Sequence, residues 1–203
     1  MIIKDDSRWL GWGSQKQAIL QVIVRPMTPT EILREARQIN PRISFGDSSA
    51  IIRELEKREI LKCLTPEQLT GRIYCLTNYG RRLVWNIFKL KIDAEERDFD
   101  WYKYSRVLAG KTRRYLIIEL YNNRGFYDDG MNLAVIRRRI GKIYPVTLSQ
   151  AFCTMQDLLK DGLVEVAGFT KKRSSKLYKL TSEGIKICEY LLRDSQQFHE
   201  QPF

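Results

Sequence analysis

Residues 73–80 read Ile73-Tyr74-Cys75-Leu76-Thr77-Asn78-Tyr79-Gly80, and a similar string, Leu177-Tyr178-Lys179-Leu180-Thr181-Ser182-Glu183-Gly184, follows 104 residues later. Each string predicts a strand ending in Leu-Thr, a helix capped by the Thr, and a Gly that lets this helix pass close to the core. Upstream, residues 54–60 match residues 157–163 with an offset of 103. The offset changes by one residue where a loop is expected. We therefore predict two similar halves.

The first half has the periodicity of three helices, a hairpin and a final helix. We expect one helix from the cap Ser14 to Pro26, a second opened by Thr28-Pro29 and ended by Asn40-Pro41, and a third that starts at Asp47 or Ser48. The third helix would bury Ile51, Ile52 and Leu55. Predicted strands at 60–64 and 72–77 flank a turn at 65–71, and Thr77 or Asn78 caps the last helix.

The second half repeats this order, with helices predicted at 112–122, 133–143, 148–160 and 182–193 and strands at 163–169 and 176–181. An insertion at 124–130 could form a short strand or a loop. The predicted fold class is α+β, mainly α, with two tandem domains of three helices, a β-hairpin and a C-terminal helix. Their boundaries are expected at 1–92 and 105–194, with an acidic and aromatic linker at 93–104 and a polar C-terminal tail at 195–203.

Two segments resemble the MarR- and PadR-like winged-helix transcriptional regulators. Leu55-Glu56-Lys57 to Leu61 resembles the end of a recognition helix, and Tyr178-Lys179-Leu180-Thr181-Ser182-Glu183-Gly184 resembles the passage from wing to helix. The resemblance implies two winged-helix domains that bind DNA. Glu59 departs from the pattern, since these regulators usually have a Gly after the recognition helix, which Gly162 keeps in the second half.

The charge of the chain favours a polyanionic partner. The net charge is +11, with 35 Lys+Arg against 24 Asp+Glu. Residues 1–90 carry 15 basic and 9 acidic side chains, and residues 104–193 carry 17 and 8, whereas residues 91–103 carry 3 and 5. The basic charge thus forms two blocks around an acidic spacer. Each phosphate that a cation neutralises releases counterions, so double-stranded DNA is the expected partner.

Candidate DNA-binding residues follow from position, because the third helix of a helix-turn-helix enters the major groove and the wing contacts the backbone. In the first half they are Ser48, Ser49 and Arg53, with Arg72 at the end of the first wing. In the second half they are Gln150, Thr154 and Gln156. An alternative is that these are solvated faces of amphipathic helices, and Ala50, Phe152 and Cys153 weaken both surfaces.

Two basic clusters add to these candidates. Lys171, Lys172, Arg173 and Lys176 lie on the tip of the second hairpin, where a wing would contact phosphates or the minor groove. Arg137, Arg138 and Arg139 precede Lys142 on the helix before the second recognition helix. Successive residues are rotated by about 100°, so one or two of the three arginines would face phosphate, and Arg137 and Arg138 are our candidates.

Catalysis, cofactors and metal binding are not expected. His199 is the one histidine and lies in the polar tail, and the four cysteines form no CxxC pair. Gly110-Lys111-Thr112 resembles the end of a phosphate-binding loop, but Ser105 stands where that motif requires Gly. We found no signal peptide and no apolar run of about 20 residues, so we expect no membrane association and a cytoplasmic location.

The sequence thus predicts a DNA-binding transcriptional regulator whose two domains act as a pseudo-dimer. One alternative is a winged-helix protein-interaction scaffold, which would expose an apolar patch on the recognition face with Ile51 or Phe152 in it. Another is a plasmid-type replication initiator. The last helices, at 79–90 and 185–192, could form a homodimer surface. Phe99, Trp101, Tyr102 and Tyr104 are expected to pack the linker rather than stack on bases.

Overall fold

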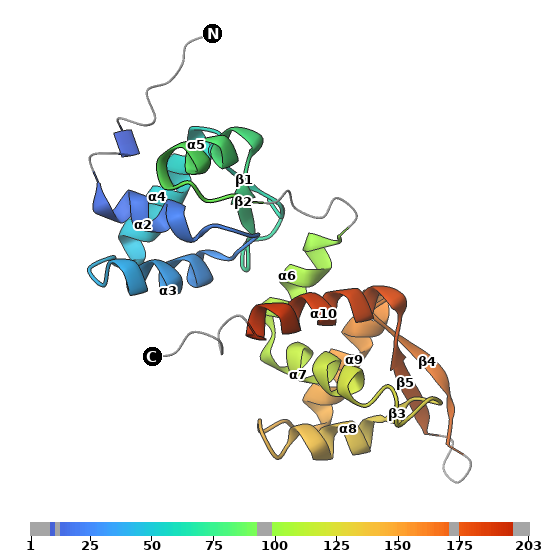
Figure 1. Ribbon diagram of the computed structural model, residues 1–203. Coiled ribbons are helices and arrows are strands. Elements are labelled where there is room, and N and C mark those ends of the chain that lie inside the picture. The colour runs from blue at the N-terminus through green and yellow to red at the C-terminus, as the bar shows by residue number, and fades with distance from the viewer. Residues whose placement is uncertain (1–8, 11–12, 93–98, 171–174, 197–203) are drawn as a thin grey trace. The chain divides into compact units, whose positions relative to one another are not determined.

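The computed structural model describes residues 9–10, 13–92, 99–170 and 175–196, with side chains up to Arg193 (Figure 1). The fold is α+β, mainly α, with two small antiparallel sheets, and is compatible with a winged-helix class. The chain divides into two compact units, Met1–Ser105 (unit 1) and Arg106–Phe203 (unit 2). This division falls inside helix α6, Trp101–Ala109.

Besides part of α6, the described residues of unit 1 form four complete helices and one two-stranded sheet. The helices are α2 (Ser14–Val22), α3 (Pro29–Ile39), α4 (Phe45–Lys57) and α5 (Asn78–Phe88), and the strands are β1 (Leu61–Cys63) and β2 (Tyr74–Leu76). Leu61 pairs with Leu76 and Cys63 with Tyr74, while Met27 forms an isolated bridge with Tyr74. The core gathers apolar side chains from all four helices and both strands, including Ile19, Ile32, Leu55, Leu61 and Val84.

Unit 2 has the same order with one extra short strand. Its helices are α7 (Lys111–Asn122), α8 (Leu133–Ile140), α9 (Leu148–Lys160) and α10 (Ser182–Gln196), and its strands are β3 (Met131–Asn132), β4 (Val164–Phe169) and β5 (Lys176–Leu180). The sheet order is β3-β5-β4, with a bulge between Val166 and Gly168. Figure 1 shows the β4–β5 hairpin projecting from the helices of this unit.

The two quoted strings form the same hydrogen bonds in their units. Thr77 Oγ1 donates to Glu59 O at 2.6 Å and accepts from Gly80 N at 3.0 Å. Thr181 Oγ1 likewise donates to Gly162 O at 2.7 Å and accepts from Gly184 N at 3.1 Å. A Cβ added at Gly80 or Gly184 would overlap the carbonyl oxygen of Ile60 or Leu163. The glycines are therefore required for the close approach of α5 to Ile60 in unit 1 and of α10 to Leu163 in unit 2.

The residues that follow α4 and α9 share a left-handed backbone. Glu59 has φ = 59° and Gly162 has φ = 69°. Glycine adopts this conformation without steric cost, whereas glutamate does not. Glu59 therefore differs from Gly162 in residue type while the chain keeps the same turn.

The insertion at 124–130 forms turns, and the strand begins after it at Met131. Met131 pairs with Tyr178 as Met27 pairs with Tyr74. Both tyrosines are buried, and burial raises the pKa of each hydroxyl. Thr28 and Asn132, the next residues, cap α3 and α8 through their side chains.

Several predicted helix boundaries were wrong, including the end of α10, which lies at Gln196 and not at Arg193. α4 begins at Phe45 because Ser44 and Asp47 form a capping box, so Ser48 falls on the buried face at 1% exposure. α2 ends at Val22, before Pro26, and α8 ends at Ile140. Ile143, predicted to end that helix, lies in the following turn and is 73% exposed.

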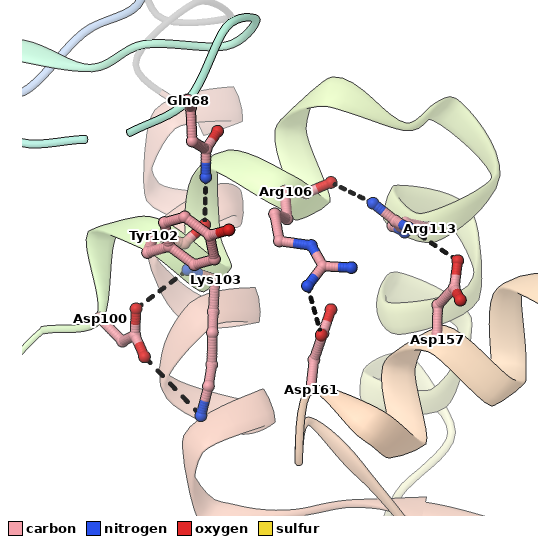
Figure 2. Close-up of polar contacts among 8 residues, drawn as sticks. All are labelled: Gln68, Asp100, Tyr102, Lys103, Arg106, Arg113, Asp157 and Asp161. Atoms are coloured by element: carbon pink, nitrogen blue, oxygen red, sulfur yellow. Dashed lines mark hydrogen bonds and ion pairs between the residues drawn. The ribbon is translucent and has the colours of Figure 1, made fainter. Parts of the chain in front are cut away.

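Residues 93–98 of the predicted linker lie outside the described residues, and α6 begins at Trp101. Phe99, Trp101 and Tyr104 are buried and pack on each other, with ring centroids 4.5 to 5.8 Å apart, while Tyr102 is 48% exposed. Residues 101–105 also bond the turn of the first hairpin. Gln68 Nε2 donates to Tyr102 O at 3.0 Å (Figure 2). Ser105 Oγ donates to Gln68 Oε1 and to Gly71 O.

Candidate nucleic-acid interface

The helix-turn-helix of unit 2 is built by α8 and α9. Asn132 caps α8, whose Ile136 and Ile140 are buried, and Thr147 caps α9, which buries Ala151, Met155 and Leu158. Residues 141–147 form the turn between them. With one face of each helix fixed in the core, the other face of each is directed to solvent.

A groove of about 480 Å³ lies at this turn, and we call it the cationic groove. Its lining residues are Arg137, Arg138, Gly141, Lys142, Pro145, Val146 and Thr147. All three cations are exposed. Among the described residues, no carboxylate forms an ion pair with them, whereas Arg139 Nε contacts Glu119 Oε1 of α7 at 2.5 Å. The structure thus separates Arg139 from Arg137 and Arg138, as helical rotation requires.

The predicted α9 residues differ in their surroundings. Gln150 is exposed, but its Oε1 accepts hydrogen bonds from Thr147 N at 3.0 Å and Thr147 Oγ1 at 3.1 Å, so it belongs to the helix cap. Thr154 and Gln156 are half-buried. The exposed large hydrophobic side chains of α9 are Leu148, at 53%, and Phe152, at 51%.

Both acidic groups at the C-terminal end of α9 are paired within unit 2. Arg113 Nη2 contacts Asp157 Oδ2 at 2.7 Å, and Arg106 Nη1 contacts Asp161 Oδ1 at 2.7 Å (Figure 2). Arg113 also donates to Arg106 O. The hydrogen bond from Arg113 lowers the pKa of Asp157. These contacts position α9 and neutralise its carboxylates.

The second hairpin carries the remaining candidates of unit 2. Lys176 is exposed and pairs with Phe169 across the two strands. Lys171, Lys172 and Arg173 lie outside the described residues. Thr170 N donates to Ser175 O at 2.9 Å, directly beyond the last paired residues of β4 and β5. Lys179 is paired with Glu165 at 3.2 Å, so this cation is neutralised on the hairpin itself.

The unit 1 candidates are less concentrated. Ser48 is wrong as a DNA contact, because its hydroxyl is buried against the core of unit 1. Ser49 and Arg53 lie together on α4, where Arg53 Nε donates to Ser49 O at 3.2 Å. Ile51, proposed for an exposed apolar patch, is 9% exposed and also wrong, while Phe152 in unit 2 is exposed as that alternative expected.

Arg72 lies on the hairpin of unit 1, between β1 and β2. Its Nε donates to Gln68 O at 2.8 Å, and a hydrogen bond with the Tyr74 side chain raises the pKa of the guanidinium. This arginine therefore has partners within its own hairpin.

Sequence reasoning missed Arg42 and Leu148. Arg42 lines a second groove of about 480 Å³ with Lys16, Asn40 and Asp47. It lies in the turn before α4, as Lys142 lies in the turn before α9, and this position was the available signal. Leu148 precedes Phe152 by one helical turn, so its spacing to an apolar residue on the recognition helix was also visible in the sequence.

The described residues contain no group of three or more His, Cys, Asp or Glu side chains able to hold a metal ion. Burial raises the pKa of the Cys188 thiol to about 12, which keeps it protonated. Over the part of the chain that the structure describes, the helices are too short or too polar to cross a bilayer.

No protein-family model and no curated protein matches this chain. Among solved structures, the crystal structure of SSV1 F-93 is similar to part of it, with 15% sequence identity and a TM-score of 0.32. The match covers 43% of this chain and 90% of that chain.

Proposed function

We propose that both units are winged-helix domains and that the chain is a cytoplasmic, non-enzymatic transcriptional regulator that binds duplex DNA. The shared order of three helices, hairpin and helix supports this proposal, as do the matching bonds around Thr77 and Thr181. The resemblance of residues 178–184 to MarR- and PadR-like regulators points the same way.

The cationic groove carries the proposal. In a helix-turn-helix the recognition helix enters the major groove, and the preceding turn then lies near the phosphates. Arg137, Arg138 and Lys142 occupy that turn and its flank, exposed and without ion pairs among the described residues. Three such cations repel one another, and a nearby anion offsets this repulsion. A phosphate backbone supplies anions at a regular spacing.

Linking two DNA-binding units makes the second contact intramolecular and raises avidity when both can engage. Unit 1 would contribute Ser49 and Arg53 on α4 and Arg42 in the turn before it. Unit 2 would contribute the cationic groove and the second hairpin. We therefore propose a pseudo-dimer in which unit 2 provides most of the phosphate contacts.

The test replaces Arg137, Arg138 and Lys142 together by glutamine and measures the affinity for duplex DNA at several salt concentrations. Each lost phosphate contact lowers the salt slope by about 0.9, so we expect a decrease of up to about 2.7 and a large loss of affinity. The matched control is K111Q/R114Q/K186Q, which removes the same charge elsewhere in unit 2. Equal slopes for the two triple variants would refute the proposed interface.

The hairpin is tested separately with K171E/K172E/R173E, whose positions the sequence assigns to the wing tip. Affinity and slope should both fall if the tip contacts phosphate. An unchanged slope in this variant would leave DNA binding to the cationic groove and remove the wing from the mechanism.

A second candidate, the protein-interaction scaffold, is favoured by the exposure of Leu148 and Phe152 on α9. It gives no role to the cationic groove. DNA binding that is lost in R137Q/R138Q/K142Q and kept in the charge-matched control would therefore decide against it.

A further inference from the structure

The outward surface of α9 exposes two large apolar side chains over its first two turns. Leu148 and Phe152 are half-exposed and stand at positions i and i+4, and the exposed Ser149 and Cys153 lie beside them at the same spacing. Few hydrogen-bonding groups are available on this helix. Gln150 is held in the cap by Thr147, and Thr154 and Gln156 are half-buried.

The electrostatic surroundings of this apolar surface favour a polyanion. Asp157 is the one acidic residue within α9, and Arg113 neutralises it at 2.7 Å. The cationic groove adjoins the N-terminal end of the helix through Thr147. A protein partner docking on this surface would have to bring its own carboxylates, whereas duplex DNA presents phosphates on both sides of a groove that admits a helix.

We infer that Phe152, with Leu148, contacts thymine 5-methyl groups in the major groove, so that α9 discriminates sites by apolar contact more than by hydrogen bonds. This inference rests on the proposed function. Thymine is the one DNA base that displays a methyl group in the major groove, and phenylalanine is among the side chains that contact it. The cationic groove then holds the adjacent phosphates while the exposed apolar surface becomes covered.

The experiment removes the methyl groups alone. The full chain is titrated with a duplex of about 24 alternating A·T pairs, long enough for two half-sites, and with the same duplex in which deoxyuridine replaces every thymine. Hydrogen-bonding groups and phosphates are unchanged between the two probes. We expect about tenfold weaker binding to the deoxyuridine duplex, the effect of about two buried methyl groups.

Phe152→Ala should bring the ratio of the two affinities close to one, while Phe126→Ala should keep it. Phe126 is 85% exposed in the turn before β3, so it controls for loss of a surface phenylalanine. Thermal melting followed by circular dichroism verifies that both variants fold. A ratio near one for the unaltered chain, with DNA binding intact, would overturn the inference and leave the proposed function standing.

Two other outcomes are distinguishable. Absence of binding to either duplex at low salt would overturn the proposed function together with the inference. Equal affinities for both duplexes, combined with a concentration-dependent dimer that Phe152→Ala abolishes, would overturn the inference by assigning the same surface to a second copy of the chain.

Discussion

The two hairpins of this protein hold the same place in the chain order but differ in strand length and in the contacts of their described residues. β1 and β2 have three residues each, and their turn is bonded to residues 101–105 through Gln68, Gly71 and Ser105. β4 and β5 have six and five residues and expose most side chains along β4. The first turn is thus part of the fold of unit 1, while the second hairpin presents Lys176 to solvent.

This difference shows that a strand-turn-strand pattern does not by itself determine how the polar groups of a hairpin are partnered. At the first hairpin Thr65, Gln68 and Ser105 are buried. Thr65 Oγ1 accepts a hydrogen bond from Ile73 N, and Ser105 Oγ of α6 donates one to Gln68 Oε1. We therefore expect substitutions in the first hairpin to change stability and substitutions in the second to change DNA affinity.

The largest effect is expected where the two units are alike. Gly80→Ala and Gly184→Ala would each place a Cβ against a backbone carbonyl, that of Ile60 or Leu163, which cannot yield as a flexible side chain can. We expect each to lower the free energy of unfolding by about 3 kcal/mol, measured by urea denaturation. Gly125→Ala, with no atom within 4 Å of the added Cβ, is the control. A loss of stability in only one of the two variants would show that α5 and α10 do not approach the carbonyls of Ile60 and Leu163 equally closely.

The next effect should separate the two hairpins. Ser105→Ala removes a buried hydroxyl that donates to Gln68 Oε1 and Gly71 O. We expect the free energy of unfolding to fall by about 2 kcal/mol, because these acceptors lose their hydrogen bond. Thr170→Ala removes the exposed hydroxyl that accepts from Ser175 N at 3.2 Å and should cost less than about 0.5 kcal/mol. Equal costs in thermal or urea unfolding would contradict the distinction between the buried bonds of Ser105 and the exposed bond between Ser175 N and Thr170.

Local signals allowed much of the fold to be predicted. The predicted helix starts at Pro29 and Leu148 are confirmed by the structure, in which Thr28 and Thr147 cap these helices. Ser44 was missed because its capping-box partner is Asp47 rather than the usual Glu or Gln. The start of α4 was then misplaced by two or three residues, and Ser48 was assigned to the wrong face.

The candidate site was predictable where helical rotation decides it. The rotation of about 100° per residue predicted that Arg137, Arg138 and Arg139 would not share a face. It could not predict which arginine pairs with Glu119, because that contact joins two helices. The bonds of Gln68 to residues 101–105 also join segments more than 30 residues apart, and no local pattern indicates them.

A smaller effect should come from exchanging the residues that differ at equivalent turns. Glu59→Gly removes the cost of a left-handed glutamate and should raise the free energy of unfolding by about 1 kcal/mol, while Gly162→Glu should lower it by about the same amount. Urea denaturation of the two variants and of their combination measures both. If Glu59→Gly destabilises the protein, the interactions of the Glu59 side chain stabilise the fold by more than its left-handed backbone destabilises it.

The smallest effect concerns the acidic residue that each unit has at the same place in its third helix, Glu54 or Asp157. Arg58 pairs with Glu54 along one helix, whereas Arg113 reaches Asp157 from another and lowers its pKa. A folded pKa below the unfolded value of about 4 means that Asp157 stabilises the fold above that pH, and that this contribution disappears as the pH falls through the folded pKa. Asp157→Asn should therefore cost less than about 1 kcal/mol at pH 7, since both groups are partly exposed, and progressively less below about pH 4.

Glu54→Gln, which breaks a pair within a single helix, should cost about 0.3–0.5 kcal/mol. Urea denaturation at several pH values tests both, and a cost of Asp157→Asn that does not change with pH would show that the ion pair with Arg113 contributes nothing to stability.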